Sequence, residues 1–135
     1  MNDDLAPGVS RTGGCLCGAV RFRFGGTPNW ITHCHCESCR RATSSPLTTY
    51  ISVPLEGFAF TGAEPVAYAS SPEVTRCHCA TCGSPVSYQH ADLPDEMHLF
   101  VAALDRADGV AIEAHDYWSE RVPWLHVDDD LPKRD

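Results

Sequence analysis

The sequence Cys-His-Cys-Ala-Thr-Cys-Gly, at residues 77–83, contains the pattern that decides the fold. Two of its cysteines, Cys79 and Cys82, are separated by two residues, and Gly83 follows directly. In such a turn the chain folds back tightly, so that both thiolates face one metal ion. Gly83 is free to adopt the positive φ that this turn commonly needs. The stretch therefore predicts a metal-binding knuckle.

All eight cysteines fall in three clusters, at residues 15–17, 34–39 and 77–82. One interpretation is a set of buried or redox-active thiols, with disulfides as its secreted variant. Thiols two or three positions apart make poor disulfide partners, and the acidic start at residues 1–4 does not resemble a secretory signal. In the reducing cytoplasm, where we expect this chain, clustered thiols indicate metal ligands instead.

The first and third clusters combine into one complete site. The Cys-x-Cys pair at residues 15–17 supplies half of a tetrahedral shell and the knuckle supplies the other half, which gives the predicted ligands Cys15, Cys17, Cys79 and Cys82. Gly18, directly after Cys17, can adopt the positive φ that the turn at the first pair needs, as Gly83 can for the knuckle. Zinc is the expected metal because it accepts four thiolates without redox demands, and iron is the alternative on ligands alone. This site would clamp the N-terminal part of the chain to its middle.

The second cluster supplies three thiolates on its own, from Cys34, Cys36 and Cys39. Three protein ligands with an exchangeable fourth position are typical of a catalytic zinc. The alternative is a second closed structural site, with Cys77, His33 or His35 as the fourth ligand. Spacing alone does not separate the two.

Length, charge and hydropathy exclude several classes of protein. The 135 residues suffice for one domain. Ten basic residues against eighteen acidic ones give a net charge of −8, which disfavours nucleic acid as a partner. The longest apolar run, residues 99–104, is far too short to cross a membrane. We expect a cytoplasmic protein with no membrane partner.

Alternating apolar residues predict a mainly antiparallel β protein with short helical turns. The clearest case is Ala19–Phe24, where Val20, Phe22 and Phe24 would share one face. Further strands are predicted at 30–33, 47–53, 58–61, 66–69, 74–77, 85–90, 97–104 and 111–117, with Gly- and Pro-rich separators between them. Short helical turns are expected at residues 37–42 and 104–107.

Three ordered segments, residues 14–22, 33–41 and 78–85, resemble the motifs of the glutathione-dependent formaldehyde-activating enzyme family, also called the Gfa or CENP-V type. The closing segment at residues 115–132 is similar as well. The resemblance covers nearly the whole chain and implies a single domain over residues 1–135, with its motif-bearing core at about 11–126. It implies the Mss4-like β-tent fold, in which sheets meet around a zinc site.

The resemblance also implies a division of ligands. The first and third motifs would bind a structural zinc through Cys15, Cys17, Cys79 and Cys82, and the second motif would bind a catalytic zinc through Cys34, Cys36 and Cys39. Two zinc ions per chain are expected, with partial loading of the second site allowed. This chain departs from the family at two positions: Ser44 stands where members usually carry glycine, and Cys77 is not a usual ligand.

The activity that the resemblance implies is that of a carbon–sulfur lyase or synthase, which joins glutathione and formaldehyde into S-hydroxymethylglutathione. Arg40 and Arg41 are candidates for holding a glutathione carboxylate, or else are surface charges. His33 and His35 are candidates for proton transfer, although in a strand both would face away from Cys34.

A second class of function fits the same residues. The domain could be a non-catalytic scaffold that binds a partner protein, with both metal sites serving the fold alone. A DNA-associated role, as in eukaryotic relatives, fits poorly with the acidic charge. The sequence predicts neither the physiological thiol and aldehyde nor the oligomeric state.

Overall fold

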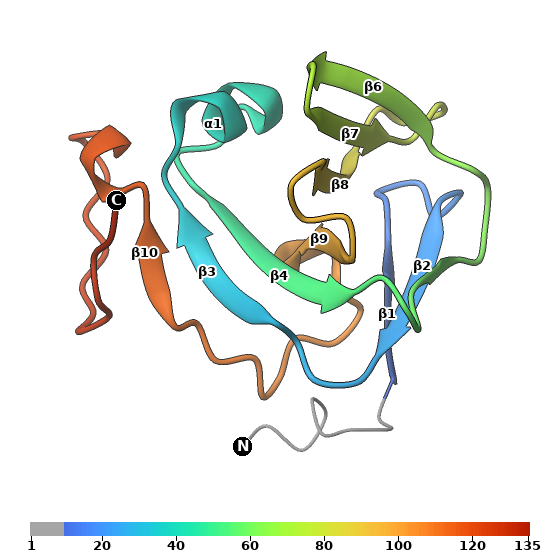
Figure 1. Ribbon diagram of the computed structural model, residues 1–135, viewed down its shortest axis with the longest axis horizontal. Coiled ribbons are helices and arrows are strands. Elements are labelled where there is room, and N and C mark those ends of the chain that lie inside the picture. The colour runs from blue at the N-terminus through green and yellow to red at the C-terminus, as the bar shows by residue number, and fades with distance from the viewer. Residues whose placement is uncertain (1–9) are drawn as a thin grey trace.

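The computed structural model of the protein describes residues 10–135, and the acidic start at residues 1–4 lies outside this range. Its strands form two sheets (Figure 1). The smaller sheet has three antiparallel strands in the order β1-β2-β5, namely β1 (Ser10–Gly14), β2 (Arg21–Gly25) and β5 (Ala59–Phe60).

The larger sheet has seven strands in the order β10-β3-β4-β9-β8-β7-β6. Their bounds are β3 (Trp30–Cys34), β4 (Thr48–Pro54), β6 (Val66–Ser71), β7 (Val74–His78), β8 (Pro85–His90), β9 (Glu96–Phe100) and β10 (Ala114–Asp116). β10 runs parallel to β3, and the other pairs are antiparallel. β8 and β9 pair only at Ser87–Leu99 and Tyr88–His98. The hairpin of β6 and β7 stands away from β3 and β4 (Figure 1).

Helical structure is short, as predicted. The helix α1 (Glu37–Thr43) follows β3, and two 3₁₀ turns, η2 (Val101–Ala103) and η3 (Trp118–Glu120), follow β9 and β10. In Figure 1, α1 lies at one end of β3 and β4 and faces the β6–β7 hairpin. Within residues 10–135, no helix has the length and apolar character needed to span a membrane.

The core forms where the alternating segment of the N-terminal sheet packs on the larger sheet. Val20, Phe22 and Phe24 are buried together, which confirms the predicted face. They join Ile51 of β4 and Leu99 of β9 in one cluster. A mainly β architecture of two sheets around the cysteine groups is therefore confirmed.

Several predicted boundaries are wrong. β1 had no strand signal in the sequence, although it pairs with β2 along its whole length. The predicted turn at 104–107 is not helical; the 3₁₀ turn lies at Val101–Ala103, so the strand predicted at 97–104 ends at Phe100. The strand predicted at 111–117 covers only Ala114–Asp116, where it pairs with β3.

Candidate metal centres and their surroundings

The first and third cysteine clusters meet, as the sequence predicts. The ligand atoms of Cys15, Cys17, Cys79 and Cys82 all lie within 4.8 Å of one another. The Sγ of Cys17 lies 3.6 Å from that of Cys15 and 3.8 Å from that of Cys79. The two halves come from the loop after β1 and the loop after β7, so this group joins two distant segments of the chain.

Backbone amides surround these sulfur atoms. The N–H groups of Thr81 and Cys82 both donate to the Sγ of Cys79 at 3.4 Å, and the N–H of Val20 donates to the Sγ of Cys15 at 3.3 Å. Such donors stabilise thiolates. Gly18 and Gly83 both have positive φ, 81° and 77°, which confirms the prediction for both turns.

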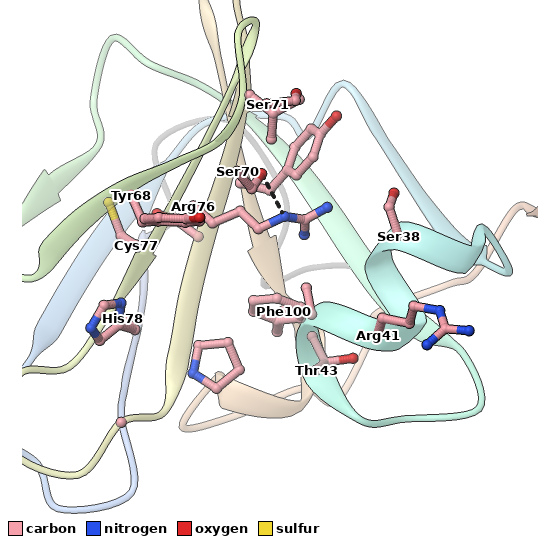
Figure 2. A pocket seen from close by; sticks show the side chains of 16 residues that line it. Ser38, Arg41, Thr43, Tyr68, Ser70, Ser71, Arg76, Cys77, His78 and Phe100 are labelled. Atoms are coloured by element: carbon pink, nitrogen blue, oxygen red, sulfur yellow. Dashed lines mark hydrogen bonds between the residues drawn. The ribbon is translucent and has the colours of Figure 1, made fainter.

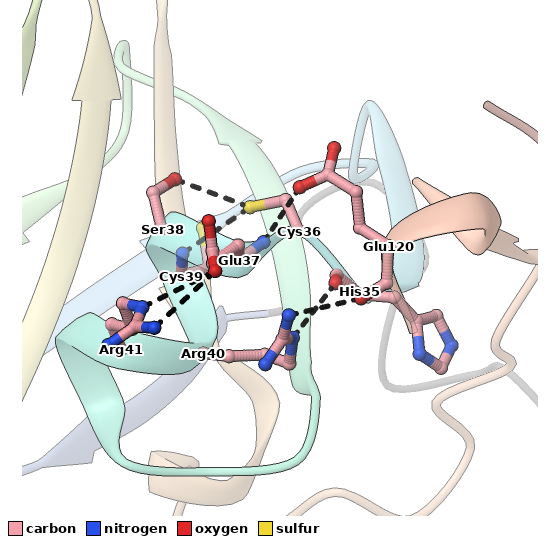
Figure 3. Close-up of polar contacts among 8 residues, drawn as sticks. All are labelled: His35, Cys36, Glu37, Ser38, Cys39, Arg40, Arg41 and Glu120. Atoms are coloured by element: carbon pink, nitrogen blue, oxygen red, sulfur yellow. Dashed lines mark hydrogen bonds and ion pairs between the residues drawn. The ribbon is translucent and has the colours of Figure 1, made fainter. Parts of the chain in front are cut away.

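The second cluster forms a separate group of three. The ligand atoms of Cys34, Cys36 and Cys39 lie within 4.8 Å of one another, and among residues 10–135 no further His, Cys, Asp or Glu belongs to this group. Cys34 ends β3, and Cys36 caps α1 by accepting the N–H of Cys39 at 3.4 Å. The start of α1 therefore fixes two of the three sulfurs, and Figure 3 shows Ser38 beside Cys36, with its Oγ 3.6 Å from the sulfur.

Two residues that the sequence did not single out contact Cys39. Tyr50 of β4 donates its hydroxyl to the Sγ at 3.4 Å, and Arg76 of β7 donates from Nη2 at 3.7 Å. Hydrogen bonds from the Cys34 and Cys36 thiols, together with those from Tyr50 and Arg76, lower the pKa of the Cys39 thiol to about 2. Burial and the nearby Cys39 raise the pKa of Tyr50, which keeps its phenol protonated as a donor.

The three cysteines line a cavity of about 660 Å³, which we call the metal cavity. Its walls include the aromatic rings of Trp30, Tyr50, Tyr88 and His98. The imidazole of His98 stacks on Tyr88, with ring centroids 5.5 Å apart, and lies 2.9 Å from a carboxylate oxygen of Glu96. No spacing in the sequence marks His98 as part of a cavity wall.

The candidates for a fourth ligand lie elsewhere. Cys77 is buried and lines a different cavity, shown in Figure 2. His33 directly precedes Cys34 and lies on the opposite face of β3, as strand alternation predicts, with its Nδ1 2.8 Å from the Oγ of Thr49. The Nε2 of His35 lies 2.8 Å from the Nδ1 of His115, and the Nε2 of His115 lies 2.9 Å from a carboxylate oxygen of Asp129.

His35 and His115 form a buried pair beside the segment that carries Cys34 and Cys36. The rings of His35 and His115 both contact Trp118 at 5.1 Å. Burial and the neighbouring His115 lower the pKa of His35 to about 4, so that its ring is neutral at pH 7. Neither His33 nor His35 lines the metal cavity, so their placement does not support a role in proton transfer there.

Arg40 and Arg41 also lie outside the metal cavity (Figure 3). Arg40 donates to the carbonyl oxygens of His35 at 3.3 Å and Glu120 at 3.1 Å, which ties α1 to η3. Arg41 pairs with Glu37 at 3.5 Å on the exposed side of the helix. Their assignment to a glutathione carboxylate stays a prediction.

Fold and site together define a β protein with two cysteine groups, each of which could hold a metal ion. A sequence profile of the glutathione-dependent formaldehyde-activating enzyme family matches residues 10–120. The chain belongs to this family. The family's name implies activation of formaldehyde with glutathione.

The other comparisons are less specific. A crystal structure of a Rhodobacter sphaeroides protein, a structural genomics target, is similar at 21% identity, with a TM-score of 0.57 over 75% of this chain and 96% of that one. At this identity the likeness supports the fold alone. No curated protein sequence matches the chain.

Proposed function

We propose that the protein is a zinc-dependent carbon–sulfur lyase or synthase that acts on a thiol–aldehyde adduct, of the S-hydroxymethylglutathione synthase type. The observation that carries this proposal is the group of Cys34, Cys36 and Cys39, which forms part of a cavity wall without a fourth protein ligand in the described chain. A group that served folding alone would be expected to complete its own tetrahedral shell.

The donor sets fit zinc. Thiolates bound at about 2.3 Å around a tetrahedral ion lie roughly 3.8 Å from one another. The Sγ–Sγ distances of 3.6 Å and 3.8 Å in the four-cysteine group agree with this value. The three-cysteine group offers the same ligand type within the same 4.8 Å limit, so it fits a zinc ion with one position left for substrate.

A zinc ion held by Cys34, Cys36 and Cys39 would supply a Lewis-acidic position that favours a substrate sulfur as thiolate. The residues of the chain provide the surroundings for this chemistry. Tyr50 and Arg76 stabilise the Cys39 thiolate through their hydrogen bonds. Trp30 and Tyr88 add aromatic walls to the cavity that these cysteines line.

The overall reaction is balanced without a redox partner. The glutathione sulfur forms a bond to the formaldehyde carbon, the carbonyl π bond opens, and the thiol proton ends on the new hydroxyl oxygen. The reverse direction breaks the same carbon–sulfur bond, which is the lyase reaction.

The variant Cys36→Ser tests this function. We expect about two zinc ions per parent chain and about one in the variant, with the fold retained and glutathione binding lost. Metal analysis, circular dichroism and calorimetric titration with glutathione measure these three properties. If the variant unfolds as severely as Cys82→Ser, or if the zinc-loaded parent binds no small thiol, the scaffold function replaces the enzyme.

A further inference from the structure

The wall of the metal cavity contains two histidines that could move a proton. The reaction proposed above transfers one proton from sulfur to oxygen, and a positioned side chain that carries it would raise the rate. His90 of β8 and His98 of β9 both line the metal cavity, whereas His33 and His35 do not. The hydrogen bonds of the two wall histidines show which of them can accept a proton.

His98 lies on the same face of the larger sheet as the three-cysteine group. The register of β3, β4 and β9, together with the alternation of side chains along each strand, places Cys34, Tyr50 and His98 on this face. The centroid of the Tyr50 ring lies 6.3 Å from that of the His98 ring. Since the Tyr50 hydroxyl lies 3.4 Å from the Sγ of Cys39, His98 is one tyrosine ring away from the sulfur atoms.

Glu96 orients the imidazole of His98. One carboxylate oxygen of Glu96 lies 2.9 Å from the Nε2 of His98 and accepts the hydroxyl of Ser52 at 2.8 Å. Because an ionised carboxylate only accepts hydrogen bonds, Nε2 carries the hydrogen of the neutral ring and Nδ1 carries the lone pair. No hydrogen bond within residues 10–135 uses Nδ1. This nitrogen can therefore accept a proton from a molecule in the cavity.

The ring of His90 is held differently. Its Nδ1 accepts the N–H of Asp92 at 3.0 Å, and its Nε2 lies 3.7 Å from a carboxylate oxygen of Glu73. The lone pair of this ring is therefore already used within the protein. Of the two histidines in the described wall of the metal cavity, His98 is the one with a lone pair to offer.

The surroundings of His98 favour its neutral, basic form. The ring is buried, stacks on Tyr88 and meets Trp30 edge-on, with centroids 4.6 Å apart. Burial lowers the pKa of His98, and the carboxylate of Glu96 raises it in part, so that the ring is neutral at pH 7. The titratable groups that face the ring are Tyr50 of β4, Tyr88 and His90 of β8, and Glu96 of its own strand.

Resting on the proposed function, we infer that His98 is the acid–base residue of the reaction and that Glu96 positions it. In the synthase direction, Nδ1 takes the thiol proton, the sulfur forms its bond to the carbonyl carbon, and the π electron pair moves to the oxygen. The imidazolium then returns the proton to this oxygen, which becomes the hydroxyl group, and the ring is neutral again. The lyase direction reverses each transfer.

The variant His98→Gln tests this role in the zinc-loaded protein, because glutamine can still donate to Glu96 but has no basic nitrogen. Zinc content and the circular dichroism spectrum should be unchanged. The rate of adduct formation above the spontaneous rate should fall by about 100-fold to 10,000-fold, in kcat rather than in KM. Exchange spectroscopy by NMR measures both rates. A loss of this size in His90→Gln, without one in His98→Gln, would overturn the assignment.

Proton release on thiol binding gives a readout that does not depend on turnover. Near pH 7, a glutathione thiol is mostly protonated, and it loses this proton when it binds a metal ion as thiolate. Calorimetric titrations in two buffers of different ionisation enthalpy count the protons that reach the buffer. We expect few from the parent, because His98 keeps the proton, and about one per bound thiol from His98→Gln. Equal release from the two proteins would contradict the inference.

A second variant tests the positioning by Glu96. Glu96→Gln removes the charge that raises the pKa of His98, so the acidic limb of the rate–pH profile should move to lower pH while zinc stays bound. A merely structural effect would lower the rate and leave this limb in place, which would overturn the role of Glu96. If the zinc-loaded parent neither binds glutathione nor exceeds the spontaneous rate, the proposed function fails and this inference fails with it. If the parent is active and His98→Gln keeps its rate, only the inference fails.

Discussion

The two cysteine groups share one ligand type but differ in the number of their sulfurs and in how far apart these lie in the sequence. Four sulfurs from the loops after β1 and β7 meet in one group, which offers enough ligands for a tetrahedral shell and joins segments 62 residues apart. Three sulfurs from six consecutive residues form the other group, beside a cavity and under the hydroxyl of Tyr50. The comparison indicates that the number of sulfurs separates the two groups: four can complete the tetrahedral coordination of an ion, whereas three leave one position open.

The strongest test of this difference compares Cys82→Ser with Cys36→Ser. The first variant opens the group that holds two distant loops, and metal binding in structural sites supplies about 10–16 kcal/mol of apparent free energy. Since the whole stability of a domain is about 5–15 kcal/mol, we expect Cys82→Ser to unfold at room temperature, while Cys36→Ser keeps its β-sheet signal. Circular dichroism with metal analysis measures both. Equal stability of the two variants would remove the distinction.

The variant Tyr50→Phe addresses only the three-cysteine group. It removes the hydroxyl that donates to the Sγ of Cys39 and leaves the ring in place. Loss of such a contact around a metal ligand weakens metal binding by about 10-fold to 100-fold. Competition with a chromogenic chelator should therefore show one zinc ion that leaves more readily than in the parent, while the second is unaffected. A change in both ions would mean that the two groups are coupled.

The smallest effect concerns the turn after α1. Ser44 ends the helix with φ 54° and ψ 40°, a left-handed conformation that glycine adopts without the steric cost of a Cβ atom. We expect Ser44→Gly to raise the free energy of unfolding by about 1 kcal/mol in denaturant titrations at fixed zinc concentration.

The matched variant Gly83→Ala should change stability in the opposite direction by a similar amount. Gly83 has φ 77°, and a Cβ there would meet nothing within 4 Å, so the cost comes from the backbone alone. If Ser44→Gly has no effect, the helix end is not a strained position.

The sequence predicted the parts of the structure that follow from short-range patterns. The group of Cys34, Cys36 and Cys39 and the turn glycines were predicted correctly because each depends on residues a few positions apart, and the four-cysteine group because each of its halves is a local pair that needs a partner. β1 was missed because its Gly13 and Gly14 look like turn signals. Both glycines are required for packing. A Cβ at Gly13 would lie 2.5 Å from the carbonyl oxygen of Ala103, and a Cβ at Gly14 would lie 2.5 Å from the carbonyl oxygen of Val20.

The residues around the metal group could not be predicted in the same way. Tyr50 and Arg76 reach Cys39 across 11 and 37 positions of sequence, and their contacts depend on the order of strands in the larger sheet. Alternation predicts which side of a strand a residue faces, but it does not predict which strands are neighbours. The resemblance predicted glycine at the position of Ser44, and the left-handed backbone there is one that glycine adopts without steric cost.

The contact between Cys17 and Cys79 also has a consequence for the order of events during folding. Closing a flexible loop of 62 residues costs about 4 kcal/mol of chain entropy. In the unfolded chain, a knuckle that has already bound its ion can also bind the distant Cys-x-Cys pair when the two segments meet. The ion then holds the two segments together. The ion would thus act as a nucleus that assembles early, and refolding would be faster when it is present from the start than when it is added afterwards.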